Sequence, residues 1–563
     1  MKRTTVLLAA LLALLMLVIS PPLLADPGGV GSARLQLVEA TVEQLQKALQ
    51  TGLVTSEQLV EMYMARIAEY EDVGVAVNAY IHVNDDALET ARALDEARHR
   101  GHARSPLYGI PVALKDIIDT DDMPTTGGSL TLEGKTPPDD AFITRRLRDA
   151  GAIIIGKLTL TEFANFIAIG MPTGYSSLGL YGFNPYDPRV LPGGDGRPVL
   201  QTGGSSSGSG IVVNANLAAL AVGTETSGSI LSPANANGVV GIKPTVGLVS
   251  RDGIIPITAD QDTAGPLTRT VADAAILLGV LAGFDPSDPA TAACLTPGNC
   301  FNDYTRFLDK KALKGARIAV PPFPANRADL MNAAIDAMRA QGADVQLINP
   351  LAAQLGICVT YPPPAPAPAP TGCSTVLLYG QKRDMNAYLA GRGDPDIETL
   401  ADIVAANTVI GPPALKYGQA IFEAAAQVNT AVGSADTTRY LADRASDLAL
   451  SRGALDAVYN GPDGIRGTKD DFDAIVLNGN NQAGTAAKAG YPSVTVPGGF
   501  ITPVPPDPIA NPFPSTVTFT GRAFSEPRLI ALAYAFEQAT KHRVPPPLLP
   551  PLETDVITRH TRK

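Results

Sequence analysis

The sequence predicts an α/β protein with a mixed central β-sheet and layers of helices. Two helix starts stand out near the N-terminus, Thr41-Val-Glu-Gln44 and Thr55-Ser-Glu-Gln58, because both fit capping boxes that satisfy the free amides of a first helical turn. Short apolar runs typical of buried strands follow at residues 108–115, 152–155, 239–242 and 254–257. Alternation of helices with such strands favours a mixed sheet packed between helices.

The remaining elements follow from periodicity and from helix-ending residues. Leu59, Tyr63, Ile67 and Tyr70 recur at helical spacing and predict a core-facing stripe. A helix over 85–100 is expected to end at Gly101, a residue suited to a left-handed cap. We further expect helices near 144–150, 273–279 and 526–540, and a strand within 490–499.

The composition indicates a compact globular protein. The chain has 563 residues, of which 45% are hydrophobic and 18% charged, and its formal net charge is −11. An acidic balance argues against a nucleic-acid or anionic-membrane partner, because both require basic patches that replace counterions.

Residues 1–25 read as a secretory signal peptide, with Lys2 and Arg3 before an apolar stretch and Pro21-Pro22 after it. The mature chain is expected to begin near residue 26, with a short extension over 26–40, and to be exported to the periplasm or secreted. Leu23 departs from the small residues preferred before a cleavage site, so an uncleaved N-terminal anchor stays an alternative. Beyond this leader, no stretch approaches the ~20 apolar residues of a membrane-spanning helix.

Four cysteines in an exported chain predict disulfides. Sequence neighbours suggest the pairs Cys294–Cys300 and Cys358–Cys373, although four cysteines allow three connectivities. A metal site is the rival interpretation, and no histidine lies near either pair.

Irregular inserts are expected near 285–304, 356–373 and 459–473, within a main domain over 41–545. The second insert contains a proline-rich run that predicts an extended arm. The third resembles some calcium loops in its carboxylates and glycines, but its spacing does not fit the EF-hand, so a solvated acidic turn is preferred. A proline-rich tail over 546–563 is expected to lie along the surface.

Residues 201–233 carry two turns rich in serine and glycine, on either side of an apolar run over 211–222. A flexible linker would have no such apolar middle. Ser206 lies in a G-x-S-x-G pattern, which favours the nucleophile of an α/β-hydrolase with a Ser-His-Asp triad. That alternative needs a strand directly before the serine and a downstream histidine, and only His542 and His560 are available.

A lysine can also activate a serine when burial favours the neutral amine. An unperturbed lysine titrates near ~10.4, and enzymes lower such bases to roughly 7–8 by desolvation and neighbouring groups. Lys115 follows an apolar strand and has the setting that this requires.

Four pieces together resemble the amidase signature family: Gly109-Ile-Pro-Val-Ala-Leu-Lys-Asp116, Gly203-Gly-Ser-Ser-Ser-Gly208, Gly223-Thr-Glu-Thr-Ser-Gly-Ser-Ile230 and Gly241-Ile-Lys-Pro-Thr245. The interval between Ser205 and Ser229 also matches the interval between the two catalytic serines of that family. Further similarity lies at 78–80, 183–186, 262–266 and 521–527, so the resemblance extends from about 41 to 545.

The resemblance implies the amidase signature fold, a central mixed sheet covered by helices on both faces, and a Ser-Ser-Lys triad. Ser229 would be the nucleophile, Ser205 the serine that shuttles the proton after a cis peptide bond, and Lys115 the base that receives it. Such an enzyme hydrolyses carboxamides to an acid and ammonia or an amine, and it uses no cofactor or metal.

The resemblance also implies an oxyanion hole in the backbone amides from Thr226 through Ser227 and Gly228 to Ser229. Such a donor contributes roughly 2.7–4 kcal/mol in comparable acyl-transfer sites. Glycine at 228 suits a backbone that must approach the substrate carbonyl. Ser206 would support the network through hydrogen bonds.

Within the family, the Thr-Glu-Thr-x-Gly-Ser-Ile variant and the run over 246–257 are similar to the peptide amidase branch, which removes terminal amides from peptides. This chain departs from that branch at Ser227, where aspartate is usual, and over 193–200. A small-molecule or peptide amide is therefore the expected partner, and no oligomeric state is predicted. A catalytically silent amidase fold that serves as a binding or assembly subunit is the remaining alternative; the leader and the complete triad argue against it.

Overall fold

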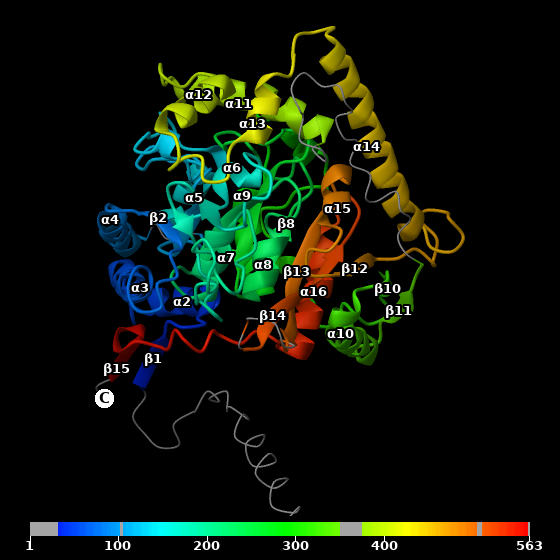
Figure 1. Ribbon diagram of the computed structural model, residues 1–563. Helices are drawn as coiled ribbons and strands as arrows, with labels where there is room; N and C mark the ends of the chain where they lie inside the picture. Colours follow the sequence, from blue (N-terminus) through cyan, green and yellow to red (C-terminus); the bar gives the residue numbers. More distant parts are fainter. Residues whose placement is uncertain (1–31, 102–104, 350–373, 504–508, 510, 561–563) are drawn as a thin grey trace, which may run out of the picture.

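The computed structural model describes residues 32–101, 105–349, 374–503, 509 and 511–560 (Figure 1). The expected leader, the whole insert over 356–373 and the pair Cys358–Cys373 within it lie outside these residues.

An eleven-stranded mixed sheet forms the centre of the molecule. Parallel pairing joins β10 to β11 and β12, and joins β3 to β4 and β7; the other neighbours pair antiparallel. The order across the sheet is β11 (Asp344–Leu347), β10 (Arg317–Val320), β12 (Ala474–Asn478), β14 (Phe513–Thr520), β13 (Ser493–Ile501), β8 (Val240–Lys243), β9 (Thr263–Thr268), β7 (Leu220–Glu225), β3 (Pro111–Lys115), β4 (Ile153–Leu158) and β2 (Tyr80–Val83).

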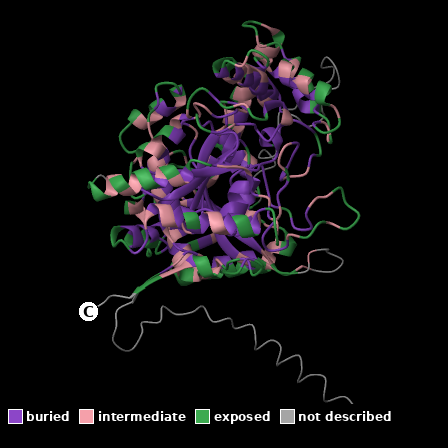
Figure 2. Ribbon diagram, turned by 90° about the vertical axis from the view of Figure 1, so that its left-hand side faces the viewer, coloured by how far each residue is buried: buried purple, intermediate pink, exposed green. Residues whose placement is uncertain are grey.

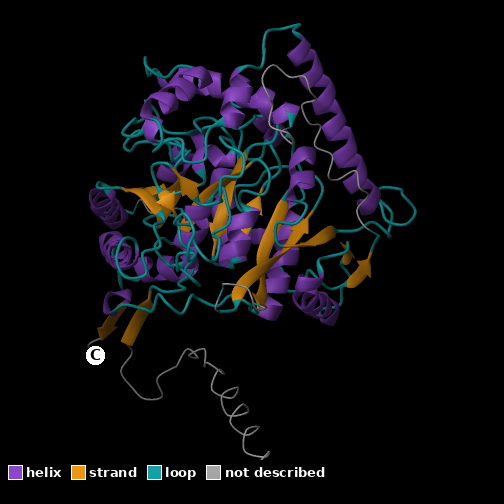
Figure 3. Ribbon diagram, in the orientation of Figure 1, coloured by secondary structure: helices purple, strands orange, loops and turns teal. Residues whose placement is uncertain are grey.

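Two groups of helices pack on this sheet, in agreement with the predicted fold class (Figures 1 and 3). One group is α7 (Ser207–Asn214) and α8 (Leu231–Asn237), which contact each other and the middle strands. The other group is contiguous and consists of α5 (Phe142–Asp149), α9 (Val271–Leu281), α16 (Glu526–Thr540) and α10 (Ala328–Ala340). Figure 2 shows that the central sheet is largely buried, whereas most of the helices around it are buried on one side and partly exposed on the other.

The apolar run over 211–222 lies wholly in this core, as predicted. It forms the end of α7 and the start of β7, which joins the two serine-rich turns through buried structure. A flexible linker is therefore excluded for this stretch.

Both predicted capping boxes are confirmed, at the starts of α2 (Val42–Gln50) and α3 (Ser56–Tyr70). Gly101 adopts a φ of +86° after α4 (Ala87–His99), which only a residue tolerant of the left-handed region takes readily. The strand expected over 254–257 is wrong: Ile254 makes one isolated bridge with Ile118, and the segment is a loop. Pro256 has no amide to donate to a ladder, and the amide of the next residue donates to a side chain instead.

A further set of helices lies above the sheet in Figure 1 and along its right-hand side. These are α11 (Thr375–Arg392), α12 (Leu400–Ile410), α13 (Ala420–Ala426), the long α14 (Ala435–Tyr459) and α15 (Ala483–Ala489). The shorter elements are α6 (Glu162–Asn165), β5 (Tyr175–Ser176), β6 (Leu180–Tyr181), η1 (Leu130–Leu132), η2 (Pro289–Leu295), η3 (Thr305–Phe307), η4 (Ala325–Arg327) and η6 (Glu553–Asp555). None of the helices within the described residues is long and apolar enough to cross a membrane.

The two ends of the described chain are joined. β1 (Ser32–Gln36) pairs antiparallel with β15 (Val556–His560). Arg66 of α3 forms an ion pair with Asp555 at 2.5 Å, and both side chains are fully buried. Tyr70 donates a hydrogen bond of 2.7 Å to the carbonyl of Pro550. The proline-rich end therefore packs on α3 through specific contacts.

The first and third predicted inserts are described. Cys294 and Cys300 form a disulfide, the pairing that their spacing suggested. Residues 460–473 form an acidic turn in which Asp463 and Asp470 accept main-chain hydrogen bonds. Across the described part of the chain, no three histidine, cysteine or acidic residues group as metal ligands would.

Candidate active site

Lys115 ends β3 and is fully buried. Its Nζ donates hydrogen bonds to Ser205 Oγ at 2.8 Å and to Thr224 Oγ1 at 2.9 Å. Burial lowers the pKa of Lys115 to about 7, although the charges of Asp262 and Glu225 act in the opposite direction. A substantial fraction of this amine is therefore neutral near pH 7 and able to accept a proton.

Ser205 is buried and follows a cis peptide bond from Gly204, as the resemblance implied. Its carbonyl accepts a hydrogen bond of 2.9 Å from the amide of Thr161. Gly203 has a φ of +69°, and a Cβ there would lie 2.5 Å from the carbonyl oxygen of Ser232. The first serine turn is thus held tightly against the second.

Ser206 is bound to the main chain of Thr224. Its Oγ donates to the Thr224 carbonyl at 3.0 Å and accepts from the Thr224 amide at 3.1 Å. Its own amide donates to the carbonyl of Ser229 at 3.3 Å, which joins the two serine turns. The support expected of Ser206 therefore has a clear geometry.

The α/β-hydrolase alternative is wrong. The residues directly before Ser206 form no strand, and the hydroxyl of Ser206 is engaged by Thr224. His542 instead follows α16 and packs against Phe536, with 6.2 Å between the ring centroids. His560 lies in the terminal strand β15.

The second turn connects β7 to α8 and carries Ser229, which is 8% exposed. Glu225, the last residue of β7, accepts hydrogen bonds from the amides of Ile230 at 2.8 Å and Leu231 at 3.1 Å. A carboxylate that binds the amides at a helix start satisfies donors with no intrahelical partner. Sequence reasoning missed this role of Glu225, although the residue lies inside the quoted Gly223–Ile230 motif.

The turn is open to solvent at Ser227, which is exposed, while Thr226 and Gly228 are buried. Gly228 has a φ of +89°, and the space beside it is bounded by Ala483 of α15, 3.5 Å from where a Cβ would lie. The predicted oxyanion segment is therefore a turn whose backbone conformation at 228 favours glycine.

Thr226 is held from the loop that precedes β9. Its hydroxyl donates to the carboxylate of Asp262, and its carbonyl accepts from Gln261 Nε2 at 3.2 Å. Sequence reasoning assigned no role to Gln261 or Asp262, although Asp262 begins one of the matching family pieces.

Arg251 and Ile254 line two cavities. The first, of about 460 Å³, is also lined by Asp119, Tyr388 and Arg392, and the second, much smaller, is also lined by Thr224 and Thr226. The larger cavity thus shares two lining residues with the small cavity beside the site.

The site gathers where parallel strands end. β3 and β7 are parallel neighbours, so Lys115 and the turn after Glu225 lie at the same edge of the sheet. The structure places Lys115 against Ser205, and Ser206 against Ser229 through the main chain. A buried amine with a lowered pKa, a hydroxyl bonded to it and a second serine turn are groups that acyl transfer can use.

The chain is similar to known amidases in sequence and in structure. The Amidase family model matches residues 58–369. A probable amidase of Arabidopsis thaliana is 36% identical over 545 residues, which cover 94% of this chain and 97% of that protein. The X-ray structure of native peptide amidase from Stenotrophomonas maltophilia matches with a TM-score of 0.77 and 38% identity, over 90% of this chain and 98% of that chain. An amidase family protein from Bacillus anthracis matches with a TM-score of 0.78 and 33% identity, over 91% and 92%. The chain therefore belongs to the amidase signature family and is an amide-hydrolysing enzyme.

Proposed function

We propose that this chain is an exported serine amidase that hydrolyses carboxamides, with the C-terminal amides of peptides as its substrate class. The observation that carries the mechanism is the hydrogen bond from the Lys115 amine to Ser205, in a site where burial brings the pKa of that amine to about 7. The peptide class is supported by 38% identity to a peptide amidase over 90% of the chain. Export is supported by the signal-like residues 1–25.

In the first half of the reaction, Ser229 Oγ attacks the carbonyl carbon of the amide. Its proton passes to Ser205 Oγ while the Ser205 proton passes to the neutral Lys115 Nζ. The negative charge that develops on the carbonyl oxygen is bound by main-chain amides between Thr226 and Ser229. Such donors act mainly in the transition state, where the charge is largest.

In the second half, the tetrahedral intermediate collapses and the C–N bond breaks. The proton held by Lys115 returns through Ser205 to the leaving nitrogen, so that ammonia departs from a primary amide. Water then attacks the acyl-enzyme ester on Ser229, and the same relay accepts its proton. The products are the free acid and regenerated enzyme.

Ammonia release from purified protein tests the hydrolytic mechanism. We expect hydrolysis of peptide amides, at least a 10³-fold loss in Ser229→Ala, as in other enzymes that lose a nucleophile, and retained activity in Ser209→Ala. Ser209 is a matched control because its buried hydroxyl donates to the Val222 carbonyl and not to a member of the proposed triad. Full activity in Ser229→Ala would contradict the mechanism.

Three further measurements separate the finer proposals. A fluorophosphonate probe should label Ser229, whereas a silent binding subunit would not be labelled. Preference for aryl or fatty-acid amides over peptide amides would contradict the substrate class. Mass spectrometry of the exported protein should find an N-terminus near residue 26. A protein that stays in the cytoplasm with residues 1–25 still attached would contradict export.

A further inference from the structure

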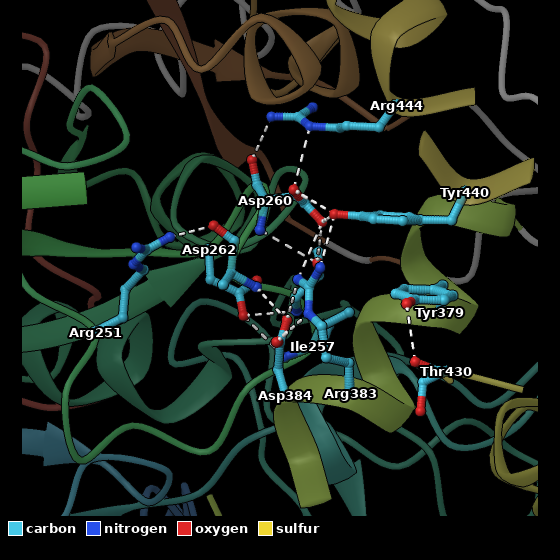
Figure 4. Close-up of polar contacts among 12 residues, drawn as sticks. Arg251, Ile257, Asp260, Asp262, Tyr379, Arg383, Asp384, Thr430, Tyr440 and Arg444 are labelled. Carbon is cyan, nitrogen blue, oxygen red and sulfur yellow. Dashed lines mark hydrogen bonds and ion pairs between the residues drawn. The ribbon is translucent and has the colours of Figure 1, made fainter. Parts of the chain in front are cut away.

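The oxyanion turn is held from outside by Asp262, which immediately precedes β9. One carboxylate oxygen accepts the hydroxyl hydrogen bond of Thr226. The other accepts the amides of Ile257 and Thr258, each at 2.8 Å. The same carboxylate therefore closes its own loop (Figure 4) and also binds the turn that leads to Ser229.

Gln261 adds a second contact to the same residue. Its side-chain amide donates to the carbonyl of Thr226, so both the hydroxyl and the carbonyl of Thr226 are bonded to consecutive residues. A peptide plane with its carbonyl fixed has its next N–H fixed as well, because the peptide unit is planar. That N–H belongs to Ser227 and is one of the proposed oxyanion donors.

The loop is in turn anchored to α11 and α14 (Figure 4). The carboxylate of Asp260 accepts from Tyr440 at 2.8 Å and forms ion pairs with Arg383 and Arg444, each at 3.3 Å. The amide of Ala259 donates to Asp384 at 2.7 Å. The support of Asp262 is thus built from rigid helices, which is what a precise catalytic geometry requires.

Asp262 also contributes charge to the site. The charge of Arg251 acts on Asp262, and the charges of Asp262 and Glu225 both act on Lys115. Burial raises the pKa of Asp262 to about 6, against its hydrogen bonds and the charge of Arg251. The ionised carboxylate favours the ammonium form of Lys115 that follows proton transfer.

We propose that Asp262 is a positioning residue for amide hydrolysis: through the Thr226 hydroxyl it fixes the turn that binds the oxyanion, and its charge stabilises protonated Lys115. The inference rests on the proposed function, because it assumes that the turn from Thr226 to Ser229 binds the developing oxyanion. In this proposal Asp262 acts through Thr226 and touches neither the substrate nor the nucleophile.

Variants at Thr226 test the contact. Thr226→Val replaces the hydroxyl by a methyl group of similar size, and we expect kcat to fall about tenfold or more with KM changed less than about threefold, since an oxyanion donor acts in the transition state. Thr226→Ser retains the hydroxyl and should restore kcat to within about threefold of wild type. A Val variant that is folded and as active as wild type would overturn the proposal.

Variants at Asp262 separate contact from charge. Asp262→Ala should lower kcat as Thr226→Val does, and the double variant should be no slower than the slower single variant, because both remove one contact. Asp262→Asn can donate its side-chain amide to Thr226, so it should keep most of kcat while the acidic limb of the kcat/KM profile moves to lower pH. If the losses of kcat multiply in the double variant, the contact role of Asp262 is overturned. If the acidic limb of the kcat/KM profile does not move in Asp262→Asn, its charge role is overturned.

Asp273→Ala is the matched control. Asp273 is another buried aspartate and lies in α9. Its carboxylate accepts a hydrogen bond of 2.9 Å from the amide of Val42 in α2. The Asp273→Ala variant should have a lower thermal stability than wild type and an unchanged kcat. If Asp262→Ala does not fold, the Thr226 pair decides the outcome. Full activity in Ser229→Ala would instead refute the proposed function, whereas a loss there together with wild-type kcat in Thr226→Val refutes only this inference.

Discussion

Replacing Lys115 by methionine should change how stability depends on pH, as well as abolish hydrolysis. Methionine is an unbranched side chain of similar length, so it fills the buried space and removes only the amine. The lost hydrogen bonds to Ser205 and Thr224 affect stability at every pH. The lost titration affects it only where folded and unfolded chains bind different numbers of protons.

The size of the effect follows from two pKa values. In the unfolded chain Lys115 keeps its proton up to about 10.5, whereas in the folded protein it loses the proton near 7. Between these values the unfolded chain binds the proton that the folded chain does not, so the free energy of unfolding rises with pH. The integrated gain from pH 7 to pH 9 is about 2 kcal/mol for wild type, at ~1.4 kcal/mol for each fully linked pH unit.

Urea unfolding of wild type and Lys115→Met at pH 7, 8 and 9 measures this difference. Other buried groups that titrate in the range, such as Lys243 with a pKa of about 8, are present in both proteins and cancel. We expect the wild type to gain about 2 kcal/mol relative to the variant. Stability curves that stay parallel would show that Lys115 is charged in the folded protein, and the proton relay would then lack its base.

Three further changes test the ion pair, the core packing and the disulfide away from the site. Arg66→Met should destabilise the protein by about 3–5 kcal/mol, because it leaves the carboxylate of Asp555 buried without its charge partner; chemical denaturation measures this, and Asp555→Asn combined with it should recover part of the loss. Phe422→Ala should cost about 3–5 kcal/mol, since this ring is fully buried in α13, and a loss below about 1 kcal/mol would contradict its packing. Reduction of the Cys294–Cys300 disulfide should lower stability by only about 2 kcal/mol, because the loop it closes is short, and calorimetry with and without reductant checks this value.

Local signals predicted much of the fold. The capping boxes at Thr41 and Thr55 and the helix over Glu526–Thr540 were predictable because each pattern is satisfied by residues within a few positions of one another. The failure at 254–257 has a different cause. Four apolar residues look like a strand, but Pro256 has no amide to donate to a ladder, and the amide of Ile257 donates to the side chain of Asp262 instead of to a neighbouring strand.

The site was predictable only in part, because its contacts join residues that are far apart in the sequence. The contact between Lys115 and Ser205 spans 90 residues, and neither hydrophobic periodicity nor spacing indicates it. The family pattern pointed to these positions because it records which residues meet. Glu225 and Asp262 stayed without a role because their partners include main-chain amides, which every residue type but proline carries and which leave no mark in the sequence.

The proposed oxyanion turn shows why these contacts of carboxylates with the main chain matter. Its glycine at 228 makes the turn possible, but glycine also leaves the backbone free to adopt other conformations. The turn is fixed at one end by the Glu225 carboxylate on the amides of α8 and at the other by Asp262 on Thr226. A donor array for a transition state must be rigid before the substrate arrives. In the proposed mechanism, two carboxylates that bind no substrate therefore hold the serine-rich segment in place for catalysis.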